Sequence, residues 1–257
     1  MKNTATVCSK RSVEKKNPCA LIVGASSGIG REVALLLLEK GWRVGVCCRR
    51  LERLHELADR YPGQVETEAL DVCRAEAPQV LERLMERVGR IDVFYLISGV
   101  GWQNPQLDPA IELQTVATNA AGFTRMVTAA FRYFESVGGG HIAVVSSIAG
   151  TRGLGAAPAY SATKRFQNTY IEALQQQARM CRLPIRFTDV RPGFVRTDLL
   201  GQGHYPCQMS PRQVACSIVR AVSRRREVVV IDWRYAFVTF LWRLIPRWIW
   251  VRISVHN

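Results

Sequence analysis

Strand-like and helix-like runs alternate along the chain from about residue 19 onward. Apolar runs rich in β-branched residues are typical of buried strands, and they cover seven segments: 19–24, 43–48, 64–70, 91–97, 141–146, 185–190 and 227–232. Amphipathic stretches typical of helices lie between them, at about 29–40, 51–60, 75–88, 109–135, 158–181 and 211–225. This alternation predicts an α/β fold in which about seven parallel strands are covered by helices on both faces.

A single domain accounts for most of the chain, because no internal repeat and no linker interrupts the alternation. We expect residues 18–232 to form one doubly wound Rossmann-type catalytic domain, with its ligand site at the carboxyl ends of the strands. Residues 1–17 are basic and no apolar stretch follows them, which predicts a loose tail rather than a signal peptide. Residues 233–257 are expected to form an amphipathic C-terminal extension.

The formal net charge of +14 favours binding to an anionic partner. The candidates are nucleic acid, an anionic cofactor and an anionic membrane surface. No recognition motif accompanies the basic residues, so we expect no nucleic-acid partner. The eight cysteines are scattered and include no C-x-x-C pair. We therefore interpret them as reduced residues of a cytoplasmic protein and predict no metal site.

A glycine-rich loop follows the first strand-like run and opens the first helix. Its sequence is Gly24-Ala25-Ser26-Ser27-Gly28-Ile29-Gly30. Glycines let a backbone approach a pyrophosphate closely, and the free N–H groups of the helix N-terminus bind anions. A glycine-rich loop can also be a plain tight turn, but its position in the first strand–helix unit favours a dinucleotide site.

A tyrosine and a lysine stand four residues apart on the helix expected at 158–181. Residues with this spacing share a helix face, so the side chains of Tyr160 and Lys164 can point into one pocket. A phenol has a pKa near 10, and a neighbouring cation would favour its anion and so make it a better acid–base catalyst. The pair alone is weak evidence, because such spacing occurs by chance in many helices.

Two segments that lie just after strands, and one inside a helix, carry further polar residues. Ser146 and Ser147 end the strand expected at 141–146, and the segment from Arg191 to Thr197 follows the next strand. Asn119 falls in the middle of the helix expected at 109–135, where asparagine lowers helix propensity.

Together with the G-x-x-x-G-x-G spacing and the Y-x-x-x-K pair, these segments resemble the short-chain dehydrogenase/reductase family over roughly residues 19–200. The resemblance implies that Ser147 binds the substrate carbonyl oxygen, Tyr160 exchanges a proton, Lys164 tunes the tyrosine and Asn119 holds a relay water. It also implies that the cofactor contacts Tyr160, Lys164 and Asn119, and that the pair Asp71-Val72 lies beside its adenine. The remaining implied cofactor contacts are Gly24, Ser26, Ser27, Gly28, Ile29, Gly30, Gly99, Pro192, Gly193, Val195 and Thr197.

The position where family members that use NAD carry an acidic residue is occupied by Cys48. Arg49 and Arg50 follow it, and guanidinium groups suit a 2′-phosphate. The alternative is a solvated arginine pair that opens a helix. Because the acid is missing, we expect NADP(H) as the cofactor.

One segment departs from the family pattern. The fourth strand usually ends Asn-Asn-Ala-Gly, whereas this chain has Leu96-Ile97-Ser98-Gly99. The glycine beside the adenine ribose is kept, and the asparagines that tie neighbouring strands together are absent. The catalytic residues are intact, so we expect an active enzyme.

The resemblance and the choice of NADP(H) predict an NADPH-dependent reductase that converts a carbonyl group to an alcohol. The same residues serve the reverse oxidation, so an NAD(P)-dependent dehydrogenase of soluble alcohols is the runner-up. A non-catalytic NADP(H)-binding sensor is the rival from another class. Homo-oligomers are common in the family, and we expect one here.

The last part of the chain combines arginine with aromatic residues. Eight arginines and four of the six tryptophans lie between residues 220 and 252, and Pro246 splits the segment into two short helical pieces. Such a composition suits the interface of an anionic bilayer, so residues 233–253 are a candidate membrane-surface contact. Packing on the chain's own domain and a dimer contact are the two alternatives. No stretch has the roughly 18 uninterrupted apolar residues of a spanning helix.

A membrane contact would place the protein in the cytoplasm, peripherally on the inner face of a membrane, and would favour a lipid-like substrate. The segment 194–210 lies where the family covers its substrate, and Leu199, Leu200, Gly201, Gly203 and Tyr205 suit a hydrophobic ligand under a movable loop. In style the region is similar to lipid-acting reductases, such as those that reduce 3-ketodihydrosphingosine.

Overall fold

The structure is a computed structural model that describes residues 17–197, 205 and 207–253. Its sheet holds seven parallel strands in the order β3-β2-β1-β4-β5-β6-β7. The strands are β1 (Cys19–Val23), β2 (Arg43–Cys48), β3 (Val65–Ala69), β4 (Val93–Leu96), β5 (Gly140–Val145), β6 (Ile185–Arg191) and β7 (Val228–Val230). The order reverses between β1 and β4, and this point of a doubly wound sheet is where a ligand crevice forms.

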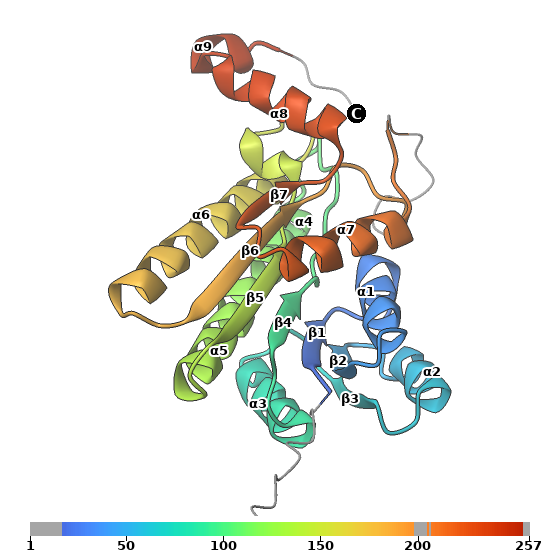
Figure 1. Cartoon of the computed structure of the whole chain (residues 1–257). Helices are drawn as coiled ribbons and strands as arrows, with labels where there is room; N and C mark the ends of the chain where they lie inside the picture. Colours follow the sequence, from blue (N-terminus) through green and yellow to red (C-terminus); the bar gives the residue numbers. More distant parts are fainter. Residues whose placement is uncertain (1–16, 198–204, 206, 254–257) are drawn as a thin grey trace, which may run out of the picture.

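Helices cover both faces of the sheet (Figure 1). They are α1 (Gly28–Leu38), α2 (Glu52–Arg60), α3 (Ala77–Val88), α4 (Pro109–Val116), α5 (Phe123–Ser136), α6 (Pro158–Met180), α7 (Pro211–Ser223), α8 (Trp233–Leu244) and α9 (Arg247–Trp250). A π-helix, η1 (Ala117–Gly122), joins α4 to α5, and a 3₁₀ helix, η2 (Ile148–Thr151), follows β5. The α/β doubly wound fold and its seven parallel strands are thereby confirmed.

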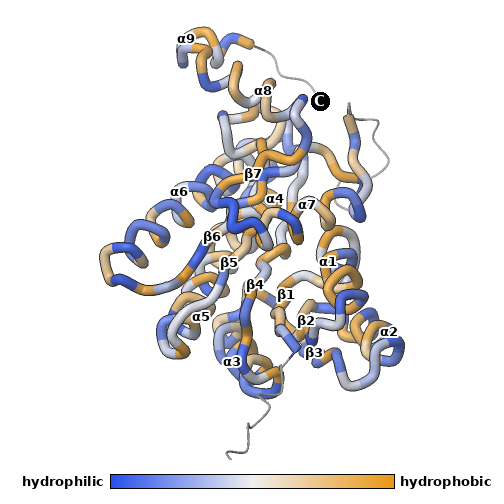
Figure 2. Tube along the Cα trace, viewed as in Figure 1, coloured by the Kyte–Doolittle hydropathy of each residue, from blue (hydrophilic) through white to orange (hydrophobic). Residues whose placement is uncertain are grey.

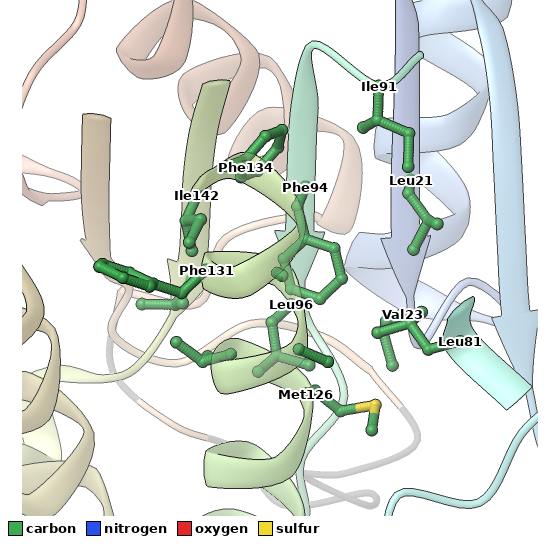
Figure 3. Close-up of a cluster of buried hydrophobic side chains, with 14 of the residues drawn as sticks. Leu21, Val23, Leu81, Ile91, Phe94, Leu96, Met126, Phe131, Phe134 and Ile142 are labelled. Atoms are coloured by element: carbon green, nitrogen blue, oxygen red, sulfur yellow. The ribbon is translucent and has the colours of Figure 1, made fainter. Parts of the chain in front are cut away.

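Two apolar layers hold the sheet between the helices. On one face, Phe94 and Ile142 of β4 and β5 pack against Met126 and Phe134 of α5, and Leu21 of β1 lies in the same layer (Figure 3). On the other face, residues of α1 and α7 cover the opposite sides of the same strands. Every residue of β1 is buried, and the strand is a continuous hydrophobic run in Figure 2, as expected for a strand covered on both faces.

The helix predicted at 109–135 is interrupted at η1, around Asn119. The asparagine side chain bonds to the backbone of Val100 instead of facing solvent, and a Cβ on Gly122 would lie 2.8 Å from Val72. A one-turn π-bulge is a common feature of functional sites and here it turns Asn119 inward. The regular α-helix is therefore interrupted at the asparagine that lowers helix propensity.

The C-terminal extension packs against its own domain through one side. Pro246 separates α8 from α9, as expected, and both helices lie beyond the carboxyl ends of the strands (Figure 1). Arg152, just after η2, donates hydrogen bonds to the carbonyl oxygens of Trp242 (3.0 Å) and Arg243 (3.1 Å), and also to that of Ile245. The indole of Trp250 donates to the Gly153 carbonyl across 2.8 Å. A guanidinium suits this position, because the last carbonyls of a helix lack internal partners.

Candidate active site

The structure brings Tyr160, Lys164 and Ser147 together at the carboxyl end of β5. Tyr160 and Lys164 lie one helical turn apart on α6, and the Lys164 Nζ atom is 5.7 Å from the centroid of the Tyr160 ring. Ser147 follows β5, and its hydroxyl accepts a hydrogen bond from the amide of Ala149 at the start of η2. The Tyr160 ring packs on Gly101, where a Cβ would approach it to 2.7 Å.

Burial favours the neutral forms of Tyr160 and Lys164, and so it shifts their pKa values in opposite directions. Desolvation raises the pKa of Tyr160, and a hydrogen bond with Ser147 acts in the opposite direction. Desolvation lowers the pKa of Lys164 to about 8, although the negative charge of Asp189 opposes this effect. We expected Lys164 to lower the pKa of Tyr160, whereas in this structure Ser147 is the group that opposes burial.

Asn119 is fixed by both ends of its side chain. Its Oδ1 accepts from the Val100 amide at 2.9 Å, and its Nδ2 donates to the Val100 carbonyl at 2.7 Å. The backbone carbonyl of Asn119, the residue that the resemblance expects to hold a relay water, accepts a hydrogen bond from Gln167 Nε2 at 2.8 Å. The oxygen of the same Gln167 amide accepts from Lys164 Nζ at 3.1 Å. A protein side chain therefore connects Lys164 to Asn119.

Gln167 was not among the residues expected from the sequence. It is buried on α6, three positions after Lys164, and it faces the same way as the lysine. A glutamine three residues after a candidate catalytic lysine could have been noticed as a residue on the same helix face. Its contact with Asn119, which is 48 positions away in the sequence, could not.

A buried polar cluster lies beneath Ser147. Ser146 donates to the carboxylate of Asp189, which also accepts from Asn168 Nδ2 (2.9 Å) and Arg191 Nε (2.7 Å). The charges of Asp189 and Arg191 are paired, and the carboxylate is almost fully enclosed. This cluster ties β5, β6 and α6 together at the level of the site, so the neighbour of Ser147 has a structural role of its own.

The glycine-rich loop has the form of a close cradle. Gly24 has a φ of 97°, and a Cβ there would lie 2.6 Å from the amide nitrogen of Ser98. A Cβ on Gly30 would overlap the carbonyl oxygen of Gly24. Ser26, Ser27, Gly28 and Ile29 are partly exposed at the N-terminus of α1. A pyrophosphate fits this arrangement, because the backbone is bare of side chains where helix N–H groups are free.

Arg50 reaches back to the glycine-rich loop, where its guanidinium lies 3.5 Å from the hydroxyl of Ser26. Arg49 and Arg50 are both exposed at the end of β2. The thiol of Cys48, in place of the family's acidic residue, donates to the Arg50 carbonyl at 3.1 Å. The contact places a cationic group beside the loop, where a phosphate on the adenosine side of a dinucleotide would need one.

The other predicted cofactor residues lie around the same crevice. The Asp71 carboxylate accepts from the amide of Cys73 at 3.0 Å, and Val72 lies against Gly122 of η1. Gly99 faces Asn119 Oδ1 and Lys164 Nζ, at 3.3 and 3.5 Å from the position of an added Cβ. Without the family asparagines, the backbone amides of Ile97 and Ser98 both bond to the Val23 carbonyl at 2.9 Å. Backbone bonds therefore join β4 to β1 at this point.

The segment after β6 closes the crevice from the other side. Pro192 accepts from the amide of Ile148 at 3.1 Å, so the segment is attached to the start of η2. Thr197 lies against Gly28, 3.0 Å from the position of an added Cβ, and its hydroxyl donates to the Val195 carbonyl at 3.3 Å. Val195 is buried and forms a bridge to Met209.

Tyr235 of α8 is a second residue that the sequence did not indicate. Its hydroxyl accepts from the Phe194 amide and donates to the Cys207 carbonyl, both at 3.3 Å. A Cβ on Gly193 would overlap its ring. Tyr205 stacks on Phe194 with ring centroids 4.6 Å apart, whereas Leu199, Leu200, Gly201 and Gly203 lie outside the described residues. Within the described residues, no group of three His, Cys, Asp or Glu side chains is arranged to hold a metal ion.

With this geometry in place, comparison with known proteins assigns the family. A family model described as short chain dehydrogenase matches residues 18–204. The chain belongs to the short-chain dehydrogenase/reductase family. It is similar to an uncharacterized oxidoreductase of Myxococcus xanthus, with 32% identity over 88% of this chain and 92% of that protein. It is also similar to the dehydrogenase/reductase SDR family member 7B of Danio rerio, with 28% identity over 86% of this chain and 79% of that protein.

Solved structures of the short-chain dehydrogenase/reductase family share the fold. The alcohol dehydrogenase of Thermococcus sibiricus, complexed with 5-hydroxy-NADP, is 25% identical with a TM-score of 0.75, over 84% of this chain and 96% of that one. A family member from Burkholderia phymatum, in complex with NAD, is 18% identical with a TM-score of 0.79, over 88% of this chain and 92% of that one. The protein is therefore an NAD(P)-dependent oxidoreductase of this family with a nicotinamide cofactor, which the glycine cradle fits.

Proposed function

We propose that this protein reduces a carbonyl group to an alcohol with NADPH, and that the substrate is a hydrophobic or lipid-like ketone. The observation that carries the proposal is the convergence of Ser147, Tyr160 and Lys164 beside the glycine cradle. They come from two elements: Ser147 follows the end of β5, and Tyr160 and Lys164 share one face of α6. Their roles as catalytic residues, and those of the cofactor residues, are part of the proposal.

In the proposed mechanism, a bound NADPH supplies the hydride that reaches the carbonyl carbon. Ser147 donates a hydrogen bond to the carbonyl oxygen and so orients the substrate. Tyr160 gives its phenolic proton to that oxygen as negative charge develops on it. The positive charge of Lys164 favours the phenolate that remains, and Gln167 holds Lys164 in place while it bonds to the Asn119 carbonyl. The reverse oxidation uses the same groups.

The preference for NADPH rests on the contact of Arg50 with Ser26 and on the absence of an acid at position 48. A carboxylate there would bind a ribose 2′-hydroxyl, whereas a guanidinium binds a 2′-phosphate. The preference for a hydrophobic ketone is supported by the aromatic pair Phe194 and Tyr205 beside the site. A dehydrogenase of soluble alcohols is the alternative within the family.

We further propose how the chain is divided into segments and where the protein is located. Residues 18–232 would form the catalytic domain, with 1–17 as a basic tail and 233–257 as an extension, and α8 begins at the proposed boundary. The protein would be a cytoplasmic homo-oligomer, with the alternative of a peripheral position on the inner face of a membrane. None of the helices in the described part of the chain combines the length and apolar character needed to cross a bilayer.

The deciding experiment measures NADPH consumption by the purified full chain against long-chain ketones and small polar carbonyls. We expect turnover that is fastest with long-chain ketones and that falls about 10²–10⁴-fold in Tyr160→Phe, because the proton donor is lost. NADPH binding, followed by fluorescence, should stay unchanged in that variant. Tyr170→Phe is the matched control, since Tyr170 lies on the same helix and its hydroxyl pairs with Thr128.

Undiminished turnover in Tyr160→Phe would overturn the catalytic assignment. Cofactor binding without turnover of any carbonyl would instead favour a non-catalytic NADP(H)-binding sensor, the rival that the altered end of β4 suggests.

A further inference from the structure

The outward side of α8 is an uninterrupted apolar stripe. Side chains at i, i+4, i+7 and i+11 share one face of a helix, and on α8 these positions are Trp233, Phe237, Phe240 and Leu244. Trp233 is 77% exposed, Phe240 58% and Leu244 64%. We name the exposed apolar side chains of α8, α9 and the residues that follow the apolar ridge: Trp233, Phe237, Val238, Phe240, Leu241, Leu244, Trp248, Val251 and Ile253.

The ridge is not the side by which the helix packs on the protein. Tyr235 and Thr239 are buried and face the body, on the opposite side of α8 from the ridge. The fold therefore buries the side of α8 that carries Tyr235 and Thr239 and leaves the apolar ridge exposed. Exposing several large aromatic side chains together is unfavourable in water, and such patches are commonly interaction sites.

Arginines flank the ridge, and of these only Arg234 forms an ion pair among the described residues, with Asp232 at the start of α8. Arg234 and Arg243 lie nine positions apart, which places them on opposite edges of the stripe, half a helical turn from each other. Arg247 and Arg252 follow on α9 and beyond it, and all four are exposed. The sequence from 233 to 253 contains no Asp or Glu.

This charge distribution decides between the candidate occupants. A second copy of the chain, docked through the same ridge, would bring two sets of Arg243, Arg247 and Arg252 together, and none of these has an ion-pair partner among the described residues. An anionic lipid surface complements the arginines, while tryptophan and phenylalanine suit the depth of the headgroups. We propose that the apolar ridge is a peripheral docking surface for an anionic bilayer, with the flanking arginines bound to lipid phosphates.

The docking surface is firmly attached to the rim of the candidate active site. Arg152, which stands five residues after Ser147, bonds to the C-terminal end of α8. Tyr235 of α8 accepts a hydrogen bond from Phe194, in the segment after β6. In Figure 1, α8 and α9 lie beyond the carboxyl ends of the strands, the edge where the site is built. Docking through the ridge would therefore bring that edge toward the lipid. The supply of substrate from the bilayer rests on the proposed ketone reductase function, whereas the binding itself does not.

The test is co-sedimentation of the full chain with vesicles, which requires no enzymatic activity. We expect binding to vesicles of equal parts phosphatidylcholine and phosphatidylglycerol, and at least about tenfold weaker binding to phosphatidylcholine alone or at high salt. Phe240→Glu should weaken binding to the anionic vesicles by at least about tenfold, because it puts a carboxylate in the middle of the ridge. The matched control is Met180→Glu, a change at a side chain that is 77% exposed at the end of α6.

Three outcomes would overturn the proposal. The first is that the protein binds neutral and anionic vesicles equally well, or binds neither. The second is that Phe240→Glu and Met180→Glu weaken binding to anionic vesicles by the same factor. The third is a change in the oligomeric state of Phe240→Glu without lipid, which would assign the ridge to a second copy of the chain. NADPH consumption with a small water-soluble ketone should be alike in Phe240→Glu and the unaltered protein, so a failure of the proposed reductase function would be recognised separately.

Discussion

The side-chain amide of Gln167 bonds to the main-chain carbonyl of Asn119 across 2.8 Å and, through its oxygen, to the ammonium of Lys164 across 3.1 Å. The amide therefore sets the position of a lysine whose pKa burial lowers to about 8. Because Lys164 is positively charged only below that pKa, its support of the phenolate depends on pH in the range near neutrality.

The rate of carbonyl reduction is expected to fall as pH rises through about 8, because Lys164 then loses its proton. In Gln167→Glu a carboxylate replaces the amide beside the ammonium, which raises the pKa of Lys164 and moves the falling limb upward by at least about one pH unit. The measurement is the pH profile of kcat/KM for NADPH oxidation. Gln176→Glu, at an exposed position of the same helix, is the control and should leave the profile in place. The contact between Gln167 and Lys164 is contradicted if Gln167→Glu has the same unfolding temperature as the unaltered protein and an unshifted pH profile of kcat/KM.

Arg50→Ala is expected to raise the KM for NADPH by about 10- to 100-fold and to change the KM for NADH little. The reason is the loss of a charge-assisted hydrogen bond to the 2′-phosphate, which NADH lacks. Steady-state kinetics with both cofactors measure the ratio. Arg60→Ala, at the far end of α2, serves as the control for removal of a positive charge from this region. Equal effects on the two cofactors would show that Arg50 does not discriminate between them.

Stability at acid pH is expected to depend on His141. Burial lowers its pKa to about 4, and its ring shares a 2.8 Å hydrogen bond with Thr188. As pH falls from about 6.5 to about 4, the unfolded chain takes up a proton at this histidine that the folded chain excludes. The free energy of unfolding should therefore decrease by up to roughly 3 kcal/mol over that window.

Urea unfolding at pH 7 and pH 4.5 measures this effect. The decrease should be smaller in His141→Gln, which keeps a polar side chain and lacks the titrating ring. His55→Gln, at an exposed position on α2, should unfold as the unaltered protein does at both pH values. If His141→Gln and the unaltered protein lose the same stability, another group controls the acid transition.

Tyr235→Phe should loosen the segment after β6 without unfolding the protein. The hydroxyl bonds to Phe194 and Cys207 are lost, at a cost of about 1 kcal/mol each, while the ring remains packed on Gly193. We expect the KM for the cofactor to rise several-fold and the thermal unfolding temperature to fall by a few degrees. Tyr61→Phe, at a partly buried tyrosine that follows α2, is the control. An unchanged KM would mean that α8 does not support the cofactor segment.

Local sequence patterns were sufficient to predict the strands and the shared helix face of Tyr160 and Lys164. The runs that end at Val23 and Val145 are continuous and apolar, and the tyrosine–lysine spacing lies within one helical turn, so neighbouring residues carry the signal. The contacts that depend on the folded chain could not be predicted. The carbonyl oxygens that accept from Arg152 lie 90 or more positions later in the sequence. Asp189 of β6 accepts a hydrogen bond from Ser146, which follows the neighbouring strand β5. Nothing near either residue in the sequence indicates those partners.

The hold of Arg152 on the end of α8 has a practical consequence for protein engineering. The C-terminal segment and the short turn after Ser147 form one mechanical unit, since Trp250 also bonds to Gly153 in that turn. A chimera that receives only the last twenty or so residues of a relative would lose the bond to Gly153 wherever the relative has another residue in place of Trp250. Grafts that exchange the turn and the C-terminal helices together are expected to keep the position of Ser147 relative to α8.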